Sequence, residues 1–372
     1  MKILAAIDSF KGSMESQTAN EIVKQALPQH EVITFPIADG GEGTVDALTS
    51  VLKGHKITES ITGPNGKQIQ GTFGWVEEER LAIIEVAEGA GITKVPAESL
   101  DPRHHTSYGV GEQIKSALNL GANEIIIGLG GSATVDGGIG LLQALGVEFY
   151  DENNQLLPTL PIRLGAVKKI ESENIDTRLK EVRITVASDV TNPLCGPDGA
   201  TYIFGPQKGL AETELEAFDK EMTSYHRVVN EWTKTHFETA PGAGAAGGIG
   251  FALYSFLDAS IENGLQLLAD KRDLANKIAQ VDLVITGEGK FDTQSLSGKV
   301  PIGISRLAKA ENVPVILFCG STEGNRIKLT EENIAAIVPI VDQPMTLEEA
   351  IKKGPDLLSR AVKRTFCLIS LR

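Results

Sequence analysis

Residues 1–27 read MKILAAIDSFKGSMESQTANEIVKQAL and contain a strand, a loop and a helix in that order. The apolar run Ile3–Ile7 is short, continuous and followed by Asp8, which is typical of a buried parallel strand. Apolar residues then recur with helical spacing over Glu15–Leu27. This strand–loop–helix unit predicts an α/β fold, in which the residues directly after the strands are placed to bind ligands.

The same alternation recurs most clearly at the two ends of the chain. Residues 1–60 and 281–372 together hold enough predicted strands for one doubly wound parallel sheet. We therefore expect a discontinuous α/β domain (1–60 plus 281–372), interrupted by a second, inserted α/β domain (61–280). Beyond the first unit, the sequence predicts strands at Val32–Ile37, Ile125–Ile127, Ile184–Ala187, Leu283–Ile285, Val315–Phe318 and Ile337–Ile340, helices at Gly137–Leu145 and Ile302–Ala310, and a hairpin of Gln68–Trp75 with Leu81–Val86.

The composition is that of a globular protein with an acidic surface. The chain has 372 residues, 41% of them hydrophobic, and a formal net charge of −14. Such a balance argues against nucleic acids and anionic membranes as partners, because both require clustered positive charge. The three cysteines lack the spacing of a metal site or a disulfide framework, and no apolar stretch is long enough for a signal peptide or a membrane span. We expect a cytoplasmic protein, and the sequence leaves a homodimer open.

Two of the loops that follow predicted strands are rich in groups that could contact an anion. Asp8–Ser13 offers a carboxylate, a lysine, a glycine and hydroxyls, although Ser13 could simply cap a helix and Lys11 could be solvated. Gly128–Gly138, called the glycine loop below, has five glycines. A plain strand–helix turn needs fewer, so we expect its backbone N–H groups, aided by the dipole of the next helix, to bind a phosphate.

Carboxylates follow three further strands. Asp189, in the loop 188–197, stands where a general base or metal ligand would stand, or where an Asx turn or helix cap would form. In the loop 286–293, Glu288 and Asp292 flank Lys290, which suits Mg²⁺ beside a phosphate. The loop 38–44 shares the pattern G-G-x-x-T-V-D with the glycine loop and contains Asp39.

The stretch Gly242–Gly247 matches G-x-G-x-x-G, the dinucleotide-binding pattern. That reading requires a strand directly before the glycines, and residues 236–241 contain no convincing apolar run. An NAD-dependent hydroxyacid oxidoreductase is therefore disfavoured but stays open, as does a non-catalytic sensor of a sugar acid or nucleotide. The sequence contains no G-x-x-x-x-G-K-[ST] loop, no H-R-D kinase motif and no G-x-S-x-G elbow.

Six of these stretches together resemble the bacterial glycerate kinase family, in the same order and over essentially the whole chain. The resemblance implies a flavodoxin-like domain interrupted by a second α/β domain, with ATP and Mg²⁺ as cofactors and D-glycerate as the acceptor. It favours 2-phospho-D-glycerate as the product and leaves 3-phosphoglycerate as the alternative. The stretches are DSFKGS (8–13), ADGGEGTVDAL (38–48), GLGGSATVDGG (128–138), ASDVTNPLCG (187–196), GAGAAGGIG (242–250) and TGEGKFDTQSLSGK (286–299).

Phosphoryl transfer requires positioning, neutralisation of charge and a base for the acceptor hydroxyl. We expect the site to lie in a cleft between the two domains, whose closure excludes water. The candidate catalytic residues are Asp189 as the base and Lys11 and Lys290 as neutralising charges; Asp8, Ser13, Asp39, Arg103 and Asn192 are candidates for the substrate, Gly130, Gly131, Ser132, Gly242, Gly244 and Gly247 for ATP, and Glu288 and Asp292 for Mg²⁺.

Overall fold

The computed structural model describes residues 1–37, 43–292, 300–322 and 331–369. Contacts within the chain divide it into two compact units. The first unit comprises Met1–Asp39, Asp46–Leu52 and Leu265–Arg372, and the second comprises Gly40–Val45 and Lys53–Gly264. The units therefore meet at other positions than the expected boundaries 60/61 and 280/281. Residues 53–60 pair within the second unit, and residues 265–280 pack with the first.

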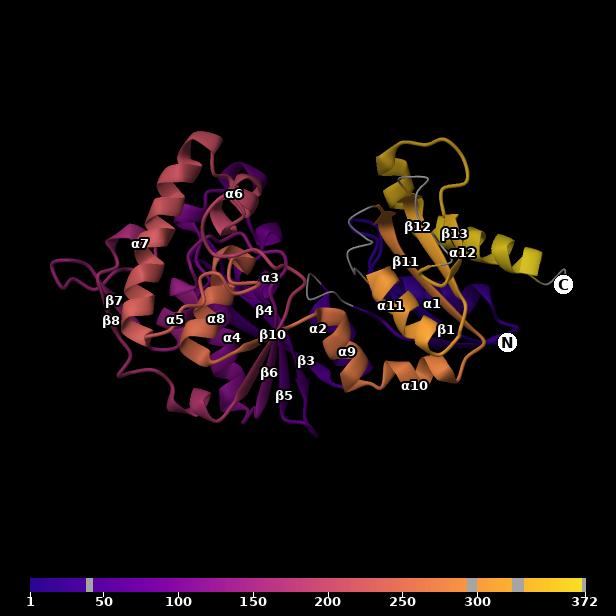
Figure 1. The fold of residues 1–372 in the computed structure, drawn as a ribbon, viewed down its shortest axis with the longest axis horizontal. Helices are drawn as coiled ribbons and strands as arrows, with labels where there is room; N and C mark the ends of the chain where they lie inside the picture. Colours follow the sequence, from indigo (N-terminus) through magenta and orange to yellow (C-terminus); the bar gives the residue numbers. More distant parts are fainter. Residues whose placement is uncertain (38–42, 293–299, 323–330, 370–372) are drawn as a thin grey trace. The chain divides into compact units, whose positions relative to one another are not determined.

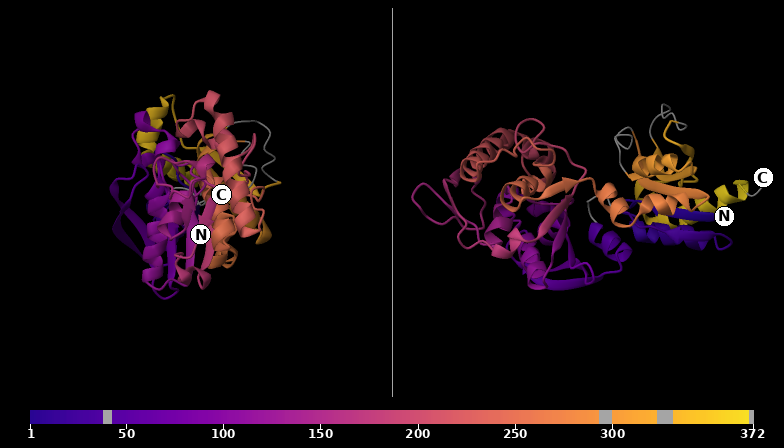
Figure 2. Two further views of the ribbon diagram at one scale, coloured as in Figure 1. Left: turned by 90° about the vertical axis from the view of Figure 1, so that its left-hand side faces the viewer. Right: turned by 60° about the horizontal axis from the view of Figure 1, so that its bottom comes forward.

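The first unit is built on a five-stranded parallel sheet in the order β13-β12-β11-β1-β2 (Figure 1). Numbered within the unit alone, this order is 2-1-3-4-5, the order of flavodoxin-type sheets. In the right-hand view of Figure 2, the first strand (indigo) and the last helix (yellow) of the chain lie together in this unit. Its strands are β1 (Lys2–Ile7), β2 (Glu31–Thr34), β11 (Leu283–Phe291), β12 (Val315–Thr322) and β13 (Ile334–Pro339).

Helices cover both faces of this sheet, as a doubly wound fold requires. Ile3, Ile7 and Phe318 belong to an apolar core shared with α1 and α12, whereas Leu317 and Cys319 pack with α11. Neighbouring side chains of a strand thus serve opposite faces. The helices are α1 (Ser16–Ala26), α10 (Leu274–Ala279), α11 (Val300–Ala310) and α12 (Leu347–Ile369), with α2 (Thr44–Val51) and α9 (Gly264–Lys271) beginning in the second unit.

The second unit is built on a six-stranded mixed sheet in the order β10-β9-β6-β5-β4-β3. Strands β10, β9, β6 and β5 are parallel, and β5, β4 and β3 continue as antiparallel neighbours, which confirms the predicted hairpin. Because β6 and β9 are central and parallel, their carboxyl ends meet at one edge. The strands are β3 (His55–Thr62), β4 (Gln68–Val76), β5 (Leu81–Glu85), β6 (Glu124–Gly128), β9 (Arg183–Ala187) and β10 (Ser260–Glu262).

Helices and a small two-stranded sheet complete the second unit (Figure 1). Ile125 and Ile127 of β6 join one continuous apolar core with α4, α5, α7 and α8. Within the described residues, no helix is both long and apolar enough to cross a membrane. The remaining elements are α3 (Val86–Ala90), α4 (Tyr108–Asn119), α5 (Ile139–Ala144), α6 (Ala200–Phe204), α7 (Leu215–Thr233), α8 (Ile249–Leu257), β7 (Glu148–Tyr150) and β8 (Lys169–Glu171).

Candidate active site

In the first unit, two predicted loops meet at the carboxyl ends of β1 and β11. The Asp8 backbone N–H donates to the Gly287 carbonyl over 3.0 Å. A Cβ on Gly289 would lie 3.5 Å from the Lys11 nitrogen, so the two backbones are in close contact. Between β1 and β11 the strand order reverses, and ligands of open α/β sheets bind at this kind of point. Asp8 and the exposed Lys11 are thus brought to one edge with the end of β11.

Ser13 is held by the last helix of the chain. Its hydroxyl donates to the Ile351 carbonyl of α12 over 2.6 Å. The helix α1 has Glu15 at its N-cap position, without a side-chain cap, so the helix-cap alternative for Ser13 is wrong. This bond anchors the Asp8–Ser13 loop to α12. Asp39, the other candidate of this part of the chain, lies outside the described residues.

The candidate magnesium ligands lie at the end of β11. Glu288, Lys290 and Asp292 are spaced by two residues, so they share one side of an extended backbone. Lys290 Nζ lies 3.7 Å from Asp292 Oδ2. Four residues of extended strand span roughly 13 Å, which is too far for both carboxylates to reach one ion easily. Since Mg²⁺ commonly binds one or two carboxylates together with phosphate oxygens, a single carboxylate would suffice; Asp292 is partly exposed, whereas Glu288 is 7% exposed.

In the second unit, the glycine loop follows β6. Gly131 is exposed and Gly130 is partly exposed, whereas residues 132–138 are all buried. The helix α5 begins only at Ile139, so the expected helix dipole does not act at Gly130 and Gly131. The predicted helix Gly137–Leu145 is confirmed as α5, and the chain reaches it through Gly137 and Gly138, both with positive φ.

The loop Gly242–Gly247 packs against the glycine loop. The Gly137 N–H donates to the Gly247 carbonyl over 3.0 Å. Gly247 has a φ of +70°, and a Cβ there would overlap the Thr134 carbonyl oxygen. All three candidate glycines of this loop are buried, and a side chain on Gly244 would overlap the Pro193 carbonyl. Close backbone packing accounts for these glycines. Residues 236–241, directly before them, form no strand, which removes the context of a dinucleotide fingerprint.

Asp189 and Asn192 lie in the loop after β9, at the same edge of the sheet. Asp189 is exposed, and its Oδ1 accepts hydrogen bonds from Asn263 Nδ2 over 2.6 Å and from the Gly264 N–H over 3.3 Å. Asn192 donates to the Asp198 carbonyl, and its own carbonyl accepts from the Gly244 N–H over 3.0 Å. The carboxylate is thereby oriented yet accessible, as a general base must be.

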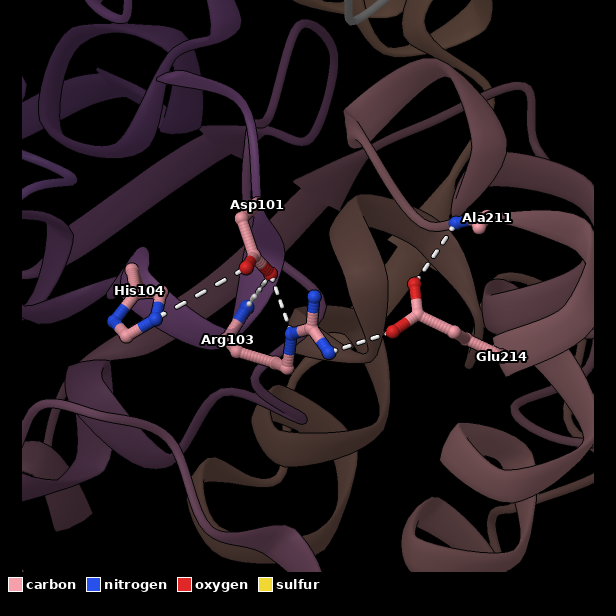
Figure 3. A network of polar contacts seen from close by, with 5 residues as sticks. All are labelled: Asp101, Arg103, His104, Ala211 and Glu214. Carbon is pink, nitrogen blue, oxygen red and sulfur yellow. Dashed lines mark hydrogen bonds and ion pairs between the residues drawn. The ribbon is translucent and has the colours of Figure 1, made fainter.

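Arg103 lies in a surface network of charges (Figure 3). Its Nε lies 2.8 Å from Asp101 Oδ1, and its Nη1 lies 2.7 Å from Glu214 Oε1. The hydrogen bond that the guanidinium donates to Asp101 raises its pKa further. Glu214 also accepts from the Ala211 N–H over 3.2 Å, and His104 lies 4.0 Å from Asp101. A substrate carboxylate at Arg103 would therefore compete with two protein carboxylates.

Two buried charged residues, one packed against the glycine loop and one within it, were not among the predicted site residues. Lys208 is 2% exposed, and its Nζ donates to Ser132 Oγ and to the Thr134 carbonyl, each over 2.8 Å. Asp136 is fully buried and accepts from the Ser107 hydroxyl over 2.7 Å and from the Gly138 N–H over 3.0 Å. The repeated G-G-x-x-T-V-D pattern was the signal for Asp136; nothing in the sequence marks Lys208 as buried.

Burial controls the protonation of both groups. It lowers the pKa of Lys208 to about 7, an effect that the charge of Asp136 opposes. Burial also raises the pKa of Asp136, against hydrogen bonds from Ser107, Gly138 and Gly140. Loss of solvent disfavours the charged form of each group. The charge of Asp136 partly restabilises the charged form of Lys208, and the hydrogen bonds to Asp136 do the same for its carboxylate.

A surface pocket of about 500 Å³ opens at the end of α7. Its lining carries charges of both signs, including Arg227, Glu231 and Glu238, and contains none of the predicted site residues. Within the described residues, no three His, Cys, Asp or Glu side chains are grouped so that they could hold a metal ion. The strand-end loops of each unit are therefore the candidate active-site regions.

Comparisons with known proteins identify the family of the chain. Residues 3–370 match the model of the glycerate kinase family. The chain is 39% identical over 375 residues to the glycerate 2-kinase of Escherichia coli strain K12, covering 100% of this chain and 98% of that relative. It is 40% identical over 359 residues to the glycerate kinase of Neisseria meningitidis, covering 95% of each. A crystal structure described as a glycerate kinase 2 from Salmonella typhimurium LT2 superimposes with a TM-score of 0.87 at 37% identity, covering 100% of this chain and 98% of that one. The chain therefore belongs to the glycerate kinase family.

Proposed function

We propose that this enzyme transfers the γ-phosphoryl group of ATP to the 2-hydroxyl of D-glycerate, giving 2-phospho-D-glycerate and ADP. The observation that carries the proposal is the chemistry of the strand-end loops. In the second unit these loops expose Gly130, Gly131 and Asp189, and in the first they expose Lys11 and Lys290. Backbone N–H groups and lysines suit phosphate oxygens, and a carboxylate suits the acceptor hydroxyl.

Asp189 is proposed to accept the proton of the glycerate hydroxyl as that oxygen attacks phosphorus. Its hydrogen bonds from Asn263 and Gly264 fix the carboxylate before the substrate arrives. Fixed orientation reduces the entropy lost in reaching the transition state. Lys11 and Lys290 are proposed to neutralise the phosphoryl oxygens, where negative charge remains spread during transfer.

The glycine loop is proposed to bind the nucleotide phosphates at Gly130 and Gly131. Mg²⁺ is proposed to be held by Glu288 or Asp292 together with phosphate oxygens, and when bound it would offset the charge of the triphosphate. Arg103 is proposed to meet the glycerate carboxylate in exchange for one of its present partners. Asn192 and Ser13 would act mainly by fixing their loops, since their polar groups bind backbone carbonyls.

The proposal is tested by following ADP release with D-glycerate, with L-glycerate and with no acceptor, each in the presence and absence of Mg²⁺. We expect turnover that requires both D-glycerate and Mg²⁺. Titration with a nicotinamide dinucleotide in the same experiment addresses the oxidoreductase alternative. Saturable nicotinamide binding without ADP release would contradict the proposal.

A further inference from the structure

The buried ammonium group of Lys208 has no part in the mechanism proposed above. Lys208 is the one buried lysine or arginine in the described part of the chain. Burying a charge costs folding free energy, and two hydrogen bonds only partly offset that cost. Such a group is more often found where function requires its charge.

The backbone of Lys208 is fixed so that its side chain points at the glycine loop. The residue ends a single helical turn, Pro206–Lys208, and its N–H donates to the Gly205 carbonyl over 3.0 Å. The Gly209 N–H closes the turn by donating to Pro206 over 3.1 Å. The side chain therefore leaves a rigid turn and ends at the loop, more than 70 positions away in sequence.

The two acceptors of Lys208 follow directly after the accessible part of the loop. Ser132 and Thr134 continue from the exposed Gly131. On its other side the loop is tied by the Ile92 N–H, which donates to the Gly131 carbonyl over 2.8 Å. Since α5 begins only at Ile139, its amino terminus places no positive charge here, and the nearby lysine does.

We infer that Lys208 is a positioning residue of the nucleotide site. It fixes the glycine loop through Ser132 and Thr134 and supplies positive charge behind the N–H groups of Gly130 and Gly131. The inference rests on the proposed function, because it takes the loop's ligand to be a nucleotide phosphate.

Protonation provides a signature that a purely structural lysine would lack. Burial leaves the pKa of Lys208 near 7, so a phosphate bound nearby would draw a proton onto its amine. The titratable groups beside this part of the loop are Asp136, Tyr225, whose hydroxyl donates to the Gly137 carbonyl, and His105, which contacts the backbone of Ala133. A comparison of two proteins that differ only at Lys208 removes their contributions.

The test is calorimetric titration of the full-length enzyme with ATP and Mg²⁺ at pH 7.5, in two buffers that differ in ionisation enthalpy. Lys208→Met keeps the length of the side chain and removes the charge. We expect its Kd for ATP to rise about tenfold or more, because a charged partner is lost. Proton uptake on binding should exceed that of the variant by up to about 0.7 of a proton. The KM for glycerate should change less than about threefold, since Lys208 acts on the nucleotide loop.

Leu118→Ala is the matched control, because Leu118 is a buried core residue near the amino end of β6, away from the loop. It lowers stability and should leave the Kd for ATP unchanged. Lys208→Gln, which keeps a hydrogen-bond donor without the charge, replaces the Met variant if that protein does not fold. Equal ATP affinity and proton uptake in wild type and variant overturn the inference alone, and so does an equal loss of affinity in Leu118→Ala. A wild-type enzyme that binds no ATP overturns the proposed function with it.

Discussion

Replacing Lys208 by methionine should change how the stability of the second unit depends on pH. The pKa of Lys208 is lowered from 10.5 to about 7 by burial in the folded protein. Between these values the unfolded chain holds a proton that the folded chain has released. Wild-type stability therefore rises with pH in this window, and the penalty for burying the charge is largest below pH 7.

The size of the effect follows from the two pKa values. Integrating the difference in bound protons from pH 6.0 to pH 8.5 gives a gain of about 2 kcal/mol in the free energy of unfolding of the wild type. Methionine does not titrate, so the variant lacks this gain. Between pH 6.0 and pH 8.5, the unfolding free energy of the wild type should thus rise by about 2 kcal/mol relative to that of the variant.

The assay is urea unfolding at pH 6.0, 7.0 and 8.5, followed by tryptophan fluorescence. Both tryptophans of the chain, Trp75 and Trp232, lie in the second unit, so the signal reports the unit that contains Lys208. A difference between the proteins that stays constant within about 0.5 kcal/mol would refute the reasoning, because Lys208 would then titrate alike in both states.

Three further substitutions, one of them with a matched control, test other parts of the structure. Gly247→Ala should lower the free energy of unfolding by at least about 2 kcal/mol in a urea titration, because it combines positive φ with a clash at Thr134. The control Gly121→Ala, at a positive φ in open space, should lower it by about 1 kcal/mol. Equal losses in the two variants would rule out the clash. Arg103→Ala should raise the KM for glycerate about tenfold in initial-rate assays. Its thermal unfolding should change little, because exposed ion pairs contribute less than about 1 kcal/mol. An unchanged KM would assign Arg103 to surface structure alone. Asp189→Asn should lower kcat by about 10² to 10⁴ with unchanged ATP binding, and near wild-type turnover would show that another group accepts the proton.

The sequence was sufficient for elements whose pattern is local. The run Ile3–Ile7 and the periodic helix after it predict β1 and α1 to within two residues, because each is defined by neighbours along the chain. Strand β3 was missed, since His55–Thr62 is half exposed and mostly polar and is held by its pairing with β4. Strand β11 continues through Gly287 and Gly289, which the sequence suggested as a loop. There the pairing with β12 overrides weak β-propensity.

The candidate site could be predicted where residues follow strands, and not where partners are distant in sequence. Asp189 could be named as a candidate because it lies two residues after a buried strand. The ion pair between Arg103 and Glu214 joins residues 111 positions apart, and no local sequence pattern predicts it. Lys208 is similar: a lysine between glycines is usually solvated, and only the packed structure reveals its contact with Ser132.

The central claim is tested most directly by identifying the product of a reaction of the full chain with ATP, Mg²⁺ and D-glycerate. Phosphorus NMR of the reaction mixture distinguishes a phosphate on a secondary carbon from one on a primary carbon. The account predicts rapid formation of ADP and 2-phospho-D-glycerate. Formation of 3-phosphoglycerate would contradict the proposed regiochemistry, and the absence of turnover with D-glycerate and other small hydroxy acids would contradict the proposed activity itself.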